Sequence, residues 1–161
     1  DHLEIFDAKL AQMGVDIIGH DDTTVTVRGP EQLSPINVVT TAYPGFPTDL
    51  QPGITALACV ANGDSFVREM IFEDRMGHVK NLRQFGATLS PEKDRLVIVQ
   101  GPAKLKATRV KASDIRAGAC CVLAGLAAEG RTSISNLYQL DRGHTRLEER
   151  LTQLGARLER L

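Results

Sequence analysis

The sequence predicts a mixed α/β (α+β) domain in which β-α-β-α-β-β units repeat around buried central helices. The first observation behind this prediction is a recurring helix end, Leu-x-Gln-x-Gly, which closes at Gly14, Gly86 and Gly155. A glycine at this point is typical of a left-handed helix cap. Other short segments reappear in similar form 65 to 67 residues later along the chain. Residues 61–63, for example, resemble residues 128–130. Echoes that keep the same order indicate an internal duplication.

A second observation concerns the character of the helices. Residues 57–61 and 117–128 are apolar on nearly every side, which is typical of helices buried on all faces. Residues 76–85 and 142–154 are amphipathic instead, so we expect these helices to face water. The expected arrangement is three outward-facing sheets around central helices, with the amphipathic helices outside.

The second repeat, residues 31–101, carries the complete unit. Its helices and strands are predicted in the order strand 37–42, helix 49–61, strand 65–70, helix 75–85, and strands 88–89 and 95–100. β-Branched residues mark the strands. Thr48 or Asp49 lies near the N-cap of the first helix, and Pro52 falls in its first turn, where proline is tolerated.

The flanking repeats, residues 1–30 and 102–161, are partial. The first consists of a helix over residues 1–13 and paired strands at 16–19 and 23–28. The third is predicted in the order strand 107–110, helix 113–128, strand 132–137, helix 145–154, and a strand that begins at residue 157. We therefore expect residues 1–161 to form a single domain, either excised from a longer parent or completed by strands from elsewhere.

Composition excludes several classes of protein. The formal net charge is −1, with 42% apolar and 24% charged residues, a balance typical of a globular domain and unlike a general nucleic-acid binder. The longest apolar stretch, residues 117–128, is too short to span a bilayer, and no secretory signal opens the chain. The three cysteines, Cys59, Cys120 and Cys121, lack disulfide or metal-site spacing, which fits buried thiols in a reducing cytoplasm and predicts no metal.

Two acidic residues lie where central helices are expected to begin. Asp49 follows a loop stiffened by two prolines and a glycine, and it is either a helix cap, which the local pattern favours, or a rigidly held general base. Asp114 holds the equivalent position in the next repeat, with Arg116 two residues later. That pair is either a cap with a solvated arginine or an anion-binding site.

Two further arginines follow acidic residues between a strand and an outer helix. In the Asp74–Arg75 and Asp141–Arg142 pairs, each arginine either forms a local ion pair or converges with Arg116 on one anionic ligand. Phe72, on the first of these loops, is either a core residue or a stacking surface. His78 and His144 are expected at the surface of the outer helices, because nothing near them has metal-ligand spacing.

Four motifs together resemble the UDP-N-acetylglucosamine 1-carboxyvinyltransferases, a family of enolpyruvyl transferases. The motifs are Pro-Gly-Phe-Pro-Thr-Asp-Leu-Gln at 44–51, Ile-Phe-Glu-Asp-Arg-Met-Gly-His-Val at 71–79, Ala-Ser-Asp-Ile-Arg-Ala at 112–117 and Leu-Asp-Arg-Gly-His-Thr-Arg-Leu-Glu at 140–148. The resemblance covers essentially the whole chain. It implies an inside-out α/β barrel and transfer of the enolpyruvyl group of phosphoenolpyruvate to the 3-hydroxyl of UDP-N-acetylglucosamine in peptidoglycan synthesis, without a cofactor.

The resemblance also implies roles for single residues. Asp49 matches the acid that contacts the sugar 3-hydroxyl, and Ile71 and Phe72 match positions near the uridine. Asp114 matches a second acid in the cleft. Three arginines match those that line the phosphoenolpyruvate cleft, namely Arg75, Arg116 and Arg142.

Two features of the resembled family are absent from this sequence. They are a Lys-Asn pair near the N-terminus and a mobile loop with a cysteine or aspartate, both of which belong to the other lobe. The resemblance therefore implies a C-terminal lobe that is inactive without a partner lobe. One alternative is a non-catalytic module that binds a sugar nucleotide or a partner lobe. A second is a shikimate-pathway enolpyruvyl transferase, which the Pro-Gly-Phe-Pro-Thr-Asp-Leu-Gln motif opposes. A third is an RNA 3′-phosphate cyclase, for which the balanced charge gives no support.

Overall fold

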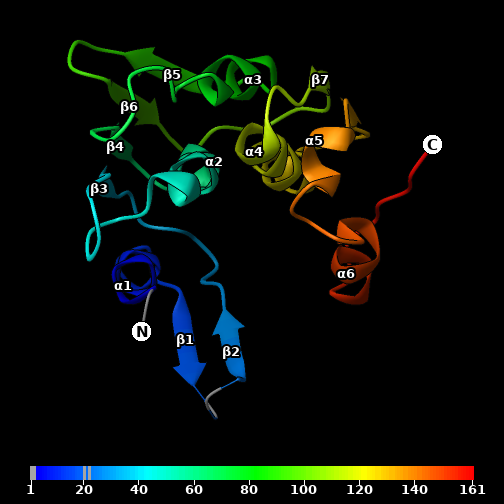
Figure 1. Ribbon diagram of the computed structural model, residues 1–161, viewed down its shortest axis with the longest axis horizontal. Helices are drawn as coiled ribbons and strands as arrows, with labels where there is room; N and C mark the ends of the chain where they lie inside the picture. Colours follow the sequence, from blue (N-terminus) through cyan, green and yellow to red (C-terminus); the bar gives the residue numbers. More distant parts are fainter. Residues whose placement is uncertain (1–2, 20, 22) are drawn as a thin grey trace.

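Two apolar helices pack against each other at the centre of the computed structural model, which describes residues 3–19, 21 and 23–161 (Figure 1). They are α2 (Gln51–Val60) and α4 (Ile115–Ala127), the two segments expected to be central. Ala58, Cys59, Cys120 and Cys121 are completely buried on these helices. All three cysteines are free and buried, which confirms the prediction of buried thiols, and burial raises the pKa of the Cys59 thiol to about 12.

A four-stranded sheet covers one side of the central helices. Its strands, in the order β3-β4-β6-β5, are β3 (Asn37–Val39), β4 (Asp64–Arg68), β6 (Leu96–Gln100) and β5 (Thr88–Pro91). β3 and β4 are parallel and are joined through α2, whereas the other pairs are antiparallel. Alternate residues such as Val67, Val97 and Val99 are completely buried, as expected for strands with one face on a core.

Two smaller sheets lie on either side of this core. Strands β1 (Asp16–Gly19) and β2 (Val25–Arg28) form the expected antiparallel pair, and β7 (Arg109–Lys111) and β8 (Ser133–Ser135) form a parallel pair joined through α4. The units β3-α2-β4 and β7-α4-β8 therefore have the same topology. Within the described residues the three sheets do not close into a barrel, and the fold is a mixed α/β domain.

The remaining helices lie around the periphery (Figure 1). They are α1 (Glu4–Gln12), α3 (His78–Gln84), α5 (Tyr138–Asp141) and α6 (Leu147–Gln153). The 3-10 turn η1 (Thr48–Leu50) leads directly into α2. The sequence did not predict α5. Residues 1 and 2 of the first predicted helix lie outside the described residues, where nothing tests that prediction.

The predicted glycine caps are confirmed, whereas the final predicted strand is wrong. Gly14, Gly86 and Gly155 have φ of +92°, +90° and +93°, a backbone conformation that favours glycine. Residues 157–161 form no regular structure. A strand needs a hydrogen-bonded neighbour, and no strand among the described residues pairs with this segment. Arg160 anchors it through ion pairs with Asp141 and Glu148.

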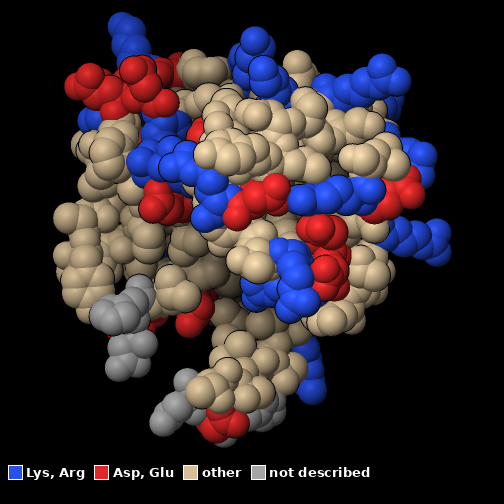
Figure 2. Space-filling model, turned by 45° about the vertical axis from the view of Figure 1, so that its right-hand side comes forward, with Lys and Arg blue, Asp and Glu red and all other residues tan. Residues whose placement is uncertain are grey.

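No helix among the described residues has the length and apolar character needed to cross a membrane. Figure 2 shows basic and acidic side chains interleaved across one face, without a large area of a single sign. This mixture agrees with the balanced composition and gives no support to a polyanion-binding surface on that face.

Gly101 provides a test of the packing between the sheet and α2. A Cβ atom at this position would lie 2.2 Å from the carbonyl oxygen of Ala61 and 3.0 Å from that of Ala58. Gly101→Ala should therefore lower the free energy of unfolding by about 1–3 kcal/mol, as overpacking against backbone does. Gly77→Ala is the matched control, because a Cβ there meets nothing within 4 Å. Urea denaturation measures both, and equal stability of the two variants would contradict this packing.

Candidate active site

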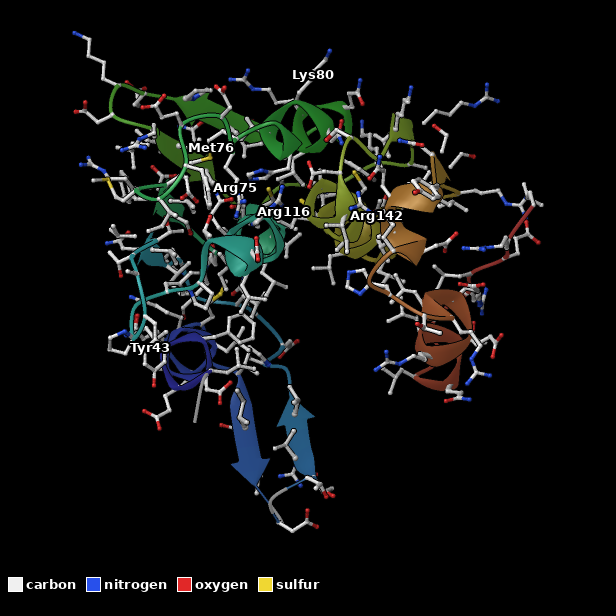
Figure 3. All side chains as sticks on the ribbon, viewed as in Figure 1. Tyr43, Arg75, Met76, Lys80, Arg116 and Arg142 are labelled. Atoms are coloured by element: carbon white, nitrogen blue, oxygen red, sulfur yellow. The ribbon has the colours of Figure 1, made fainter. Side chains whose placement is uncertain are left out.

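The carboxylate of Asp49 is the meeting point of two arginines from distant parts of the chain. Its Oδ1 accepts hydrogen bonds from Nη1 of Arg75 at 2.7 Å and from Nη1 of Arg116 at 3.2 Å. The Asp49 side chain is 69% exposed, while those of Arg75 and Arg116 are 15% and 29% exposed. An accessible carboxylate thus lies against two largely covered guanidinium groups. Figure 3 shows Arg75 and Arg116 close to each other near α2 and α4.

Asp49 does not cap a helix, so the interpretation favoured by the local pattern is wrong. The N-cap residues of η1 and α2 are Pro47 and Leu50, and neither makes a side-chain cap bond. Two cations attract the carboxylate away from the local backbone, and charge-assisted hydrogen bonds are stronger than neutral ones. Pro52 lies in the first turn of α2, as predicted.

Asp114 does cap a helix, and it also binds an arginine. Its Oδ1 accepts hydrogen bonds from the backbone N–H groups of Arg116 at 2.9 Å and Ala117 at 3.2 Å, and from Nε of Arg116 at 3.2 Å. Burial raises the pKa of Asp114, but these N–H groups, the Ser113 hydroxyl and the Arg116 charge together lower it below its ordinary value. The helix-cap interpretation of Asp114 is therefore confirmed, and the cap residue also orients Arg116. Anion binding by this pair stays a prediction.

Arg75 connects the carboxylate to an exposed aromatic ring. Its guanidinium carbon lies 3.8 Å from the centroid of the Phe72 ring, a cation–π arrangement. Nη1 of Arg75 also donates to Oγ1 of Thr48 at 3.1 Å. Phe72 is 47% exposed, and its neighbour Ile71 is exposed as well. Phe72 is therefore a surface available for stacking and does not belong to the core.

Arg142 lies apart from this cluster. It is the C-cap residue of α5 and is exposed, and Figure 3 shows it on the α5 side of α4. Asp49 pairs with Arg75 and Arg116, and no ion pair among the described residues includes Arg142. The predicted local ion pairs, Asp74–Arg75 and Asp141–Arg142, are also absent among the described residues. Arg75 binds Asp49 instead, and Asp141 binds Arg160.

Sequence reasoning missed a completely buried acid, Glu69, below the cluster. Its Oε2 accepts a hydrogen bond from Thr48, and its Oε1 accepts from the backbone N–H groups of Ile71 and Phe72. A sequence signal was present, because Ser65, Val67 and Glu69 follow one another at two-residue spacing in the predicted strand 65–70 and therefore share a face. Ser65 and Val67 are also completely buried. Continuing the two-residue period places Glu69 inward.

The expectation that His78 is exposed is wrong. His78 opens α3 and is only 2% exposed, and its Nε2 has no hydrogen-bond partner among the residues that the structure describes. Burial lowers the pKa of His78 to about 4, although the backbone carbonyl of Arg75 and the charges of Asp114 and Glu69 raise it. His78 is buried because α3 packs against α4, β5 and β7. His144 is half-buried instead of fully exposed.

An apolar cavity of about 730 Å³ adjoins the cluster. It lies between α1, the β2–β3 connection, α2 and α4, and Asp49, Arg116 and His144 contribute the ionisable groups of its lining. Its apolar lining includes Phe6, Leu10, Leu57, Ile115 and Leu123. The carboxylate–arginine cluster therefore lies at a boundary between solvent and an apolar hollow.

The arrangement suits proton transfer beside an anion. An ionised carboxylate accepts a proton, and fixed guanidinium groups neutralise phosphate or carboxylate groups. Among the described residues no group of three or more histidines, cysteines or acids is placed to hold a metal ion.

Comparison with known proteins places this geometry in a family. The sequence profile of EPSP synthase (3-phosphoshikimate 1-carboxyvinyltransferase) matches residues 1–151. UDP-N-acetylglucosamine 1-carboxyvinyltransferase 2 of Bacillus subtilis (strain 168) is 47% identical over 159 residues, which are 99% of this chain and 37% of that protein. UDP-N-acetylglucosamine 1-carboxyvinyltransferase of Geotalea uraniireducens (strain Rf4) is 44% identical over 161 residues, which are 100% of this chain and 38% of that protein. The chain therefore spans little more than a third of these relatives.

Solved structures agree with the sequence comparison. The crystal structure of the enolpyruvyl transferase NikO from Streptomyces tendae has a TM-score of 0.86 and 32% identity, covering 96% of this chain and 36% of that one. EPSP synthase from Acinetobacter baumannii has a TM-score of 0.58 at 20% identity over 79% of this chain and 30% of its own, which shows the fold alone.

Buried His78 predicts a pH dependence of stability. Its folded pKa of about 4 lies below the ordinary 6.5, so between these values the unfolded chain binds a proton that the folded chain does not. The free energy of unfolding should therefore fall as the pH drops from 6.5 to 4, by up to about 3 kcal/mol from this group. Urea denaturation across this range measures it. His78→Gln should remove that part of the slope, and identical slopes in both proteins would contradict the assignment.

Proposed function

The chain belongs to the enolpyruvyl transferase family, and we propose that it forms the C-terminal lobe of a UDP-N-acetylglucosamine 1-carboxyvinyltransferase. The reaction transfers the enolpyruvyl group of phosphoenolpyruvate to the 3-hydroxyl of UDP-N-acetylglucosamine and releases phosphate, a step of peptidoglycan synthesis. The observation that carries this proposal is the exposed Asp49 carboxylate between Arg75 and Arg116.

The proposed chemistry assigns Asp49 as the base. The 3-hydroxyl must lose its proton as its oxygen attacks C2 of the enol, and an accessible ionised carboxylate can accept that proton. Asp49 is held on a short turn by two arginines, so its position is fixed before substrate arrives. Arg75, Arg116 and Arg142 are proposed to neutralise the phosphate and carboxylate of phosphoenolpyruvate, and Asp114 orients Arg116.

The sugar nucleotide is proposed to bind beside Phe72. The exposed ring and the neighbouring Ile71 offer an apolar surface suited to a uracil base, and the contact with Arg75 holds the ring next to the base residue. Arg75 then lies between the two substrate regions. This placement is consistent with a single pocket for both substrates.

We also propose that the complete lobe closes as an inside-out α/β barrel. The cavity of about 730 Å³ supports this, because α2 and α4 both contribute apolar side chains to its lining. These are the central helices of the second and third repeats. A third central helix, belonging to the first repeat, would fill the cavity and complete the arrangement. The relatives, which are longer than this chain, have sequence available for it.

This chain alone is expected to show no turnover, because the Lys-Asn pair and the cysteine loop of the other lobe are not in its sequence. The alternative function is binding of a sugar nucleotide or a partner lobe without catalysis. An experiment in which the chain is joined to the N-terminal lobe of a relative distinguishes the enzyme from the non-catalytic module. Enolpyruvyl transfer by the joined protein supports the enzyme, and ligand binding without transfer favours the module.

Asp49→Asn in the joined protein tests the base. The amide cannot accept the hydroxyl proton, so kcat should fall by about 10²–10⁴-fold. Folding should be retained, because exposed ion pairs contribute at most about 1 kcal/mol. Asp74→Asn, another exposed acid of the region, is the matched control. Unchanged phosphate release by Asp49→Asn would refute the assignment.

Arg142→Ala tests the third arginine. Removing a cation that faces phosphoenolpyruvate should raise the KM for that substrate more than the KM for UDP-N-acetylglucosamine, by at least about tenfold for a charged hydrogen-bond partner. Arg150→Ala on α6 serves as the control for loss of an exposed positive charge. Equal effects on both substrates would assign Arg142 a structural role instead.

A further inference from the structure

Below the carboxylate–arginine cluster, two side chains form a second layer that none of the proposed substrate contacts involves. We propose that Glu69 and Thr48 are positioning residues that form a hydrogen-bond relay and fix Arg75 between Asp49 and Phe72. The inference extends the proposed function, because it names what sets the geometry of that site. It rests on the contacts of three elements, namely η1, the end of β4 and the loop that follows β4.

The relay begins with the buried carboxylate of Glu69. This group is completely buried, and a buried charge is costly unless hydrogen bonds compensate for it. The backbone N–H groups of Ile71 and Phe72 donate to Oε1 at 2.9 and 3.1 Å. Oε2 accepts from the Thr48 hydroxyl at 2.8 Å. Three donors thus converge on Glu69, and they tie the loop after β4 to the turn before α2.

The single proton of the Thr48 hydroxyl determines the next link. An ionised carboxylate only accepts hydrogen bonds, so the hydroxyl must direct its proton at Glu69. Its lone pairs are then free for a donor, and Nη1 of Arg75 lies 3.1 Å away. The same Nη1 lies 2.7 Å from Oδ1 of Asp49, the residue next to Thr48. Because Glu69 can only accept, the Thr48 O–H bond points toward it, and the oxygen of that hydroxyl accepts from Arg75. This second hydrogen bond helps to hold Arg75 against Asp49.

Glu69 also fixes the other contact of Arg75. The carboxylate binds the backbone N–H of Phe72, whose ring lies 3.8 Å below the Arg75 guanidinium. One buried acid thus restrains both the ring and, through Thr48, the cation that covers it. In the proposed enzyme these groups contact different substrates, so Glu69 couples the sugar-nucleotide side of the site to the phosphoenolpyruvate side.

Thr48→Val and Thr48→Ser form the matched pair that tests the relay. Valine keeps the shape of threonine but removes the hydroxyl, whereas serine keeps the hydroxyl and loses only a methyl group. In the joined two-lobe protein, Thr48→Val should lower kcat/KM by about 10–100-fold, the effect of a small misplacement of catalytic groups. Thr48→Ser should remain within about threefold of the parent and unfold at a similar urea concentration. Thr48→Val should fold but unfold at a lower urea concentration, because Oε2 of the buried Glu69 loses its donor.

Glu69→Gln tests the direction of the hydrogen bond. The amide oxygen can still accept from the two backbone N–H groups, but its NH₂ group faces Thr48, which then accepts instead of donating. The hydroxyl proton loses its acceptor, so the loss of kcat/KM should be similar to that of Thr48→Val. If the variant does not fold, the threonine pair decides alone.

A readout independent of turnover separates this inference from the proposed function. In the isolated chain, the guanidinium N–H resonances of Arg75, assigned by their absence in Arg75→Lys, should be sharp and resolved. Thr48→Val should broaden or shift them toward free arginine, and Thr48→Ser should not. The relay is overturned if Thr48→Val leaves these resonances unchanged, or if Thr48→Ser is as impaired as Thr48→Val. Absent turnover in the joined parent protein would refute the function and leave this test intact.

Discussion

The attraction between one carboxylate and two guanidinium groups is the constraint on which the candidate site depends. Asp49, Arg75 and Arg116 belong to η1, to the loop after β4 and to the first turn of α4, so the cluster forms only when these elements are correctly placed. Ion pairs with an exposed partner contribute little stability. The cluster therefore contributes little to the stability of the fold, and the packing of the surrounding elements must position its three side chains.

The packing of α2 against α4 supplies that support. Both helices are rich in small apolar residues, and Gly118 illustrates their close approach to neighbours, since a Cβ there would lie 2.9 Å from Cγ of Leu140. Each helix begins beside one member of the cluster, with Asp49 just before α2 and Arg116 in the first turn of α4. The packing of α2 against α4 thus brings the N-termini of the two helices close together. The buried Glu69 then adds fine positioning to this coarse placement.

The sequence predicted the parts that depend on local pattern. The caps at Gly14, Gly86 and Gly155, the paired strands β1 and β2, and Asp114 as a helix cap all follow from neighbouring residues, and the structure confirms them. Asp49 was misread by the same local criteria, because its partners lie 26 and 67 residues away. Burial of His78 depends on how α3 packs over the core, which local pattern does not encode, whereas the two-residue period of β4 was a local signal for the burial of Glu69. The predicted strand from residue 157 failed because strand formation requires a neighbour that the described chain does not place there.

The central claim is that this chain holds a preformed half of a sugar-nucleotide site. Titration of the isolated chain with UDP-N-acetylglucosamine, followed through backbone amide chemical shifts, tests it most directly. The account predicts saturable shifts confined to residues around Asp49, Ile71 and Phe72, because these groups are already in place without ligand. Absence of shifts in a folded chain at saturating ligand would contradict it.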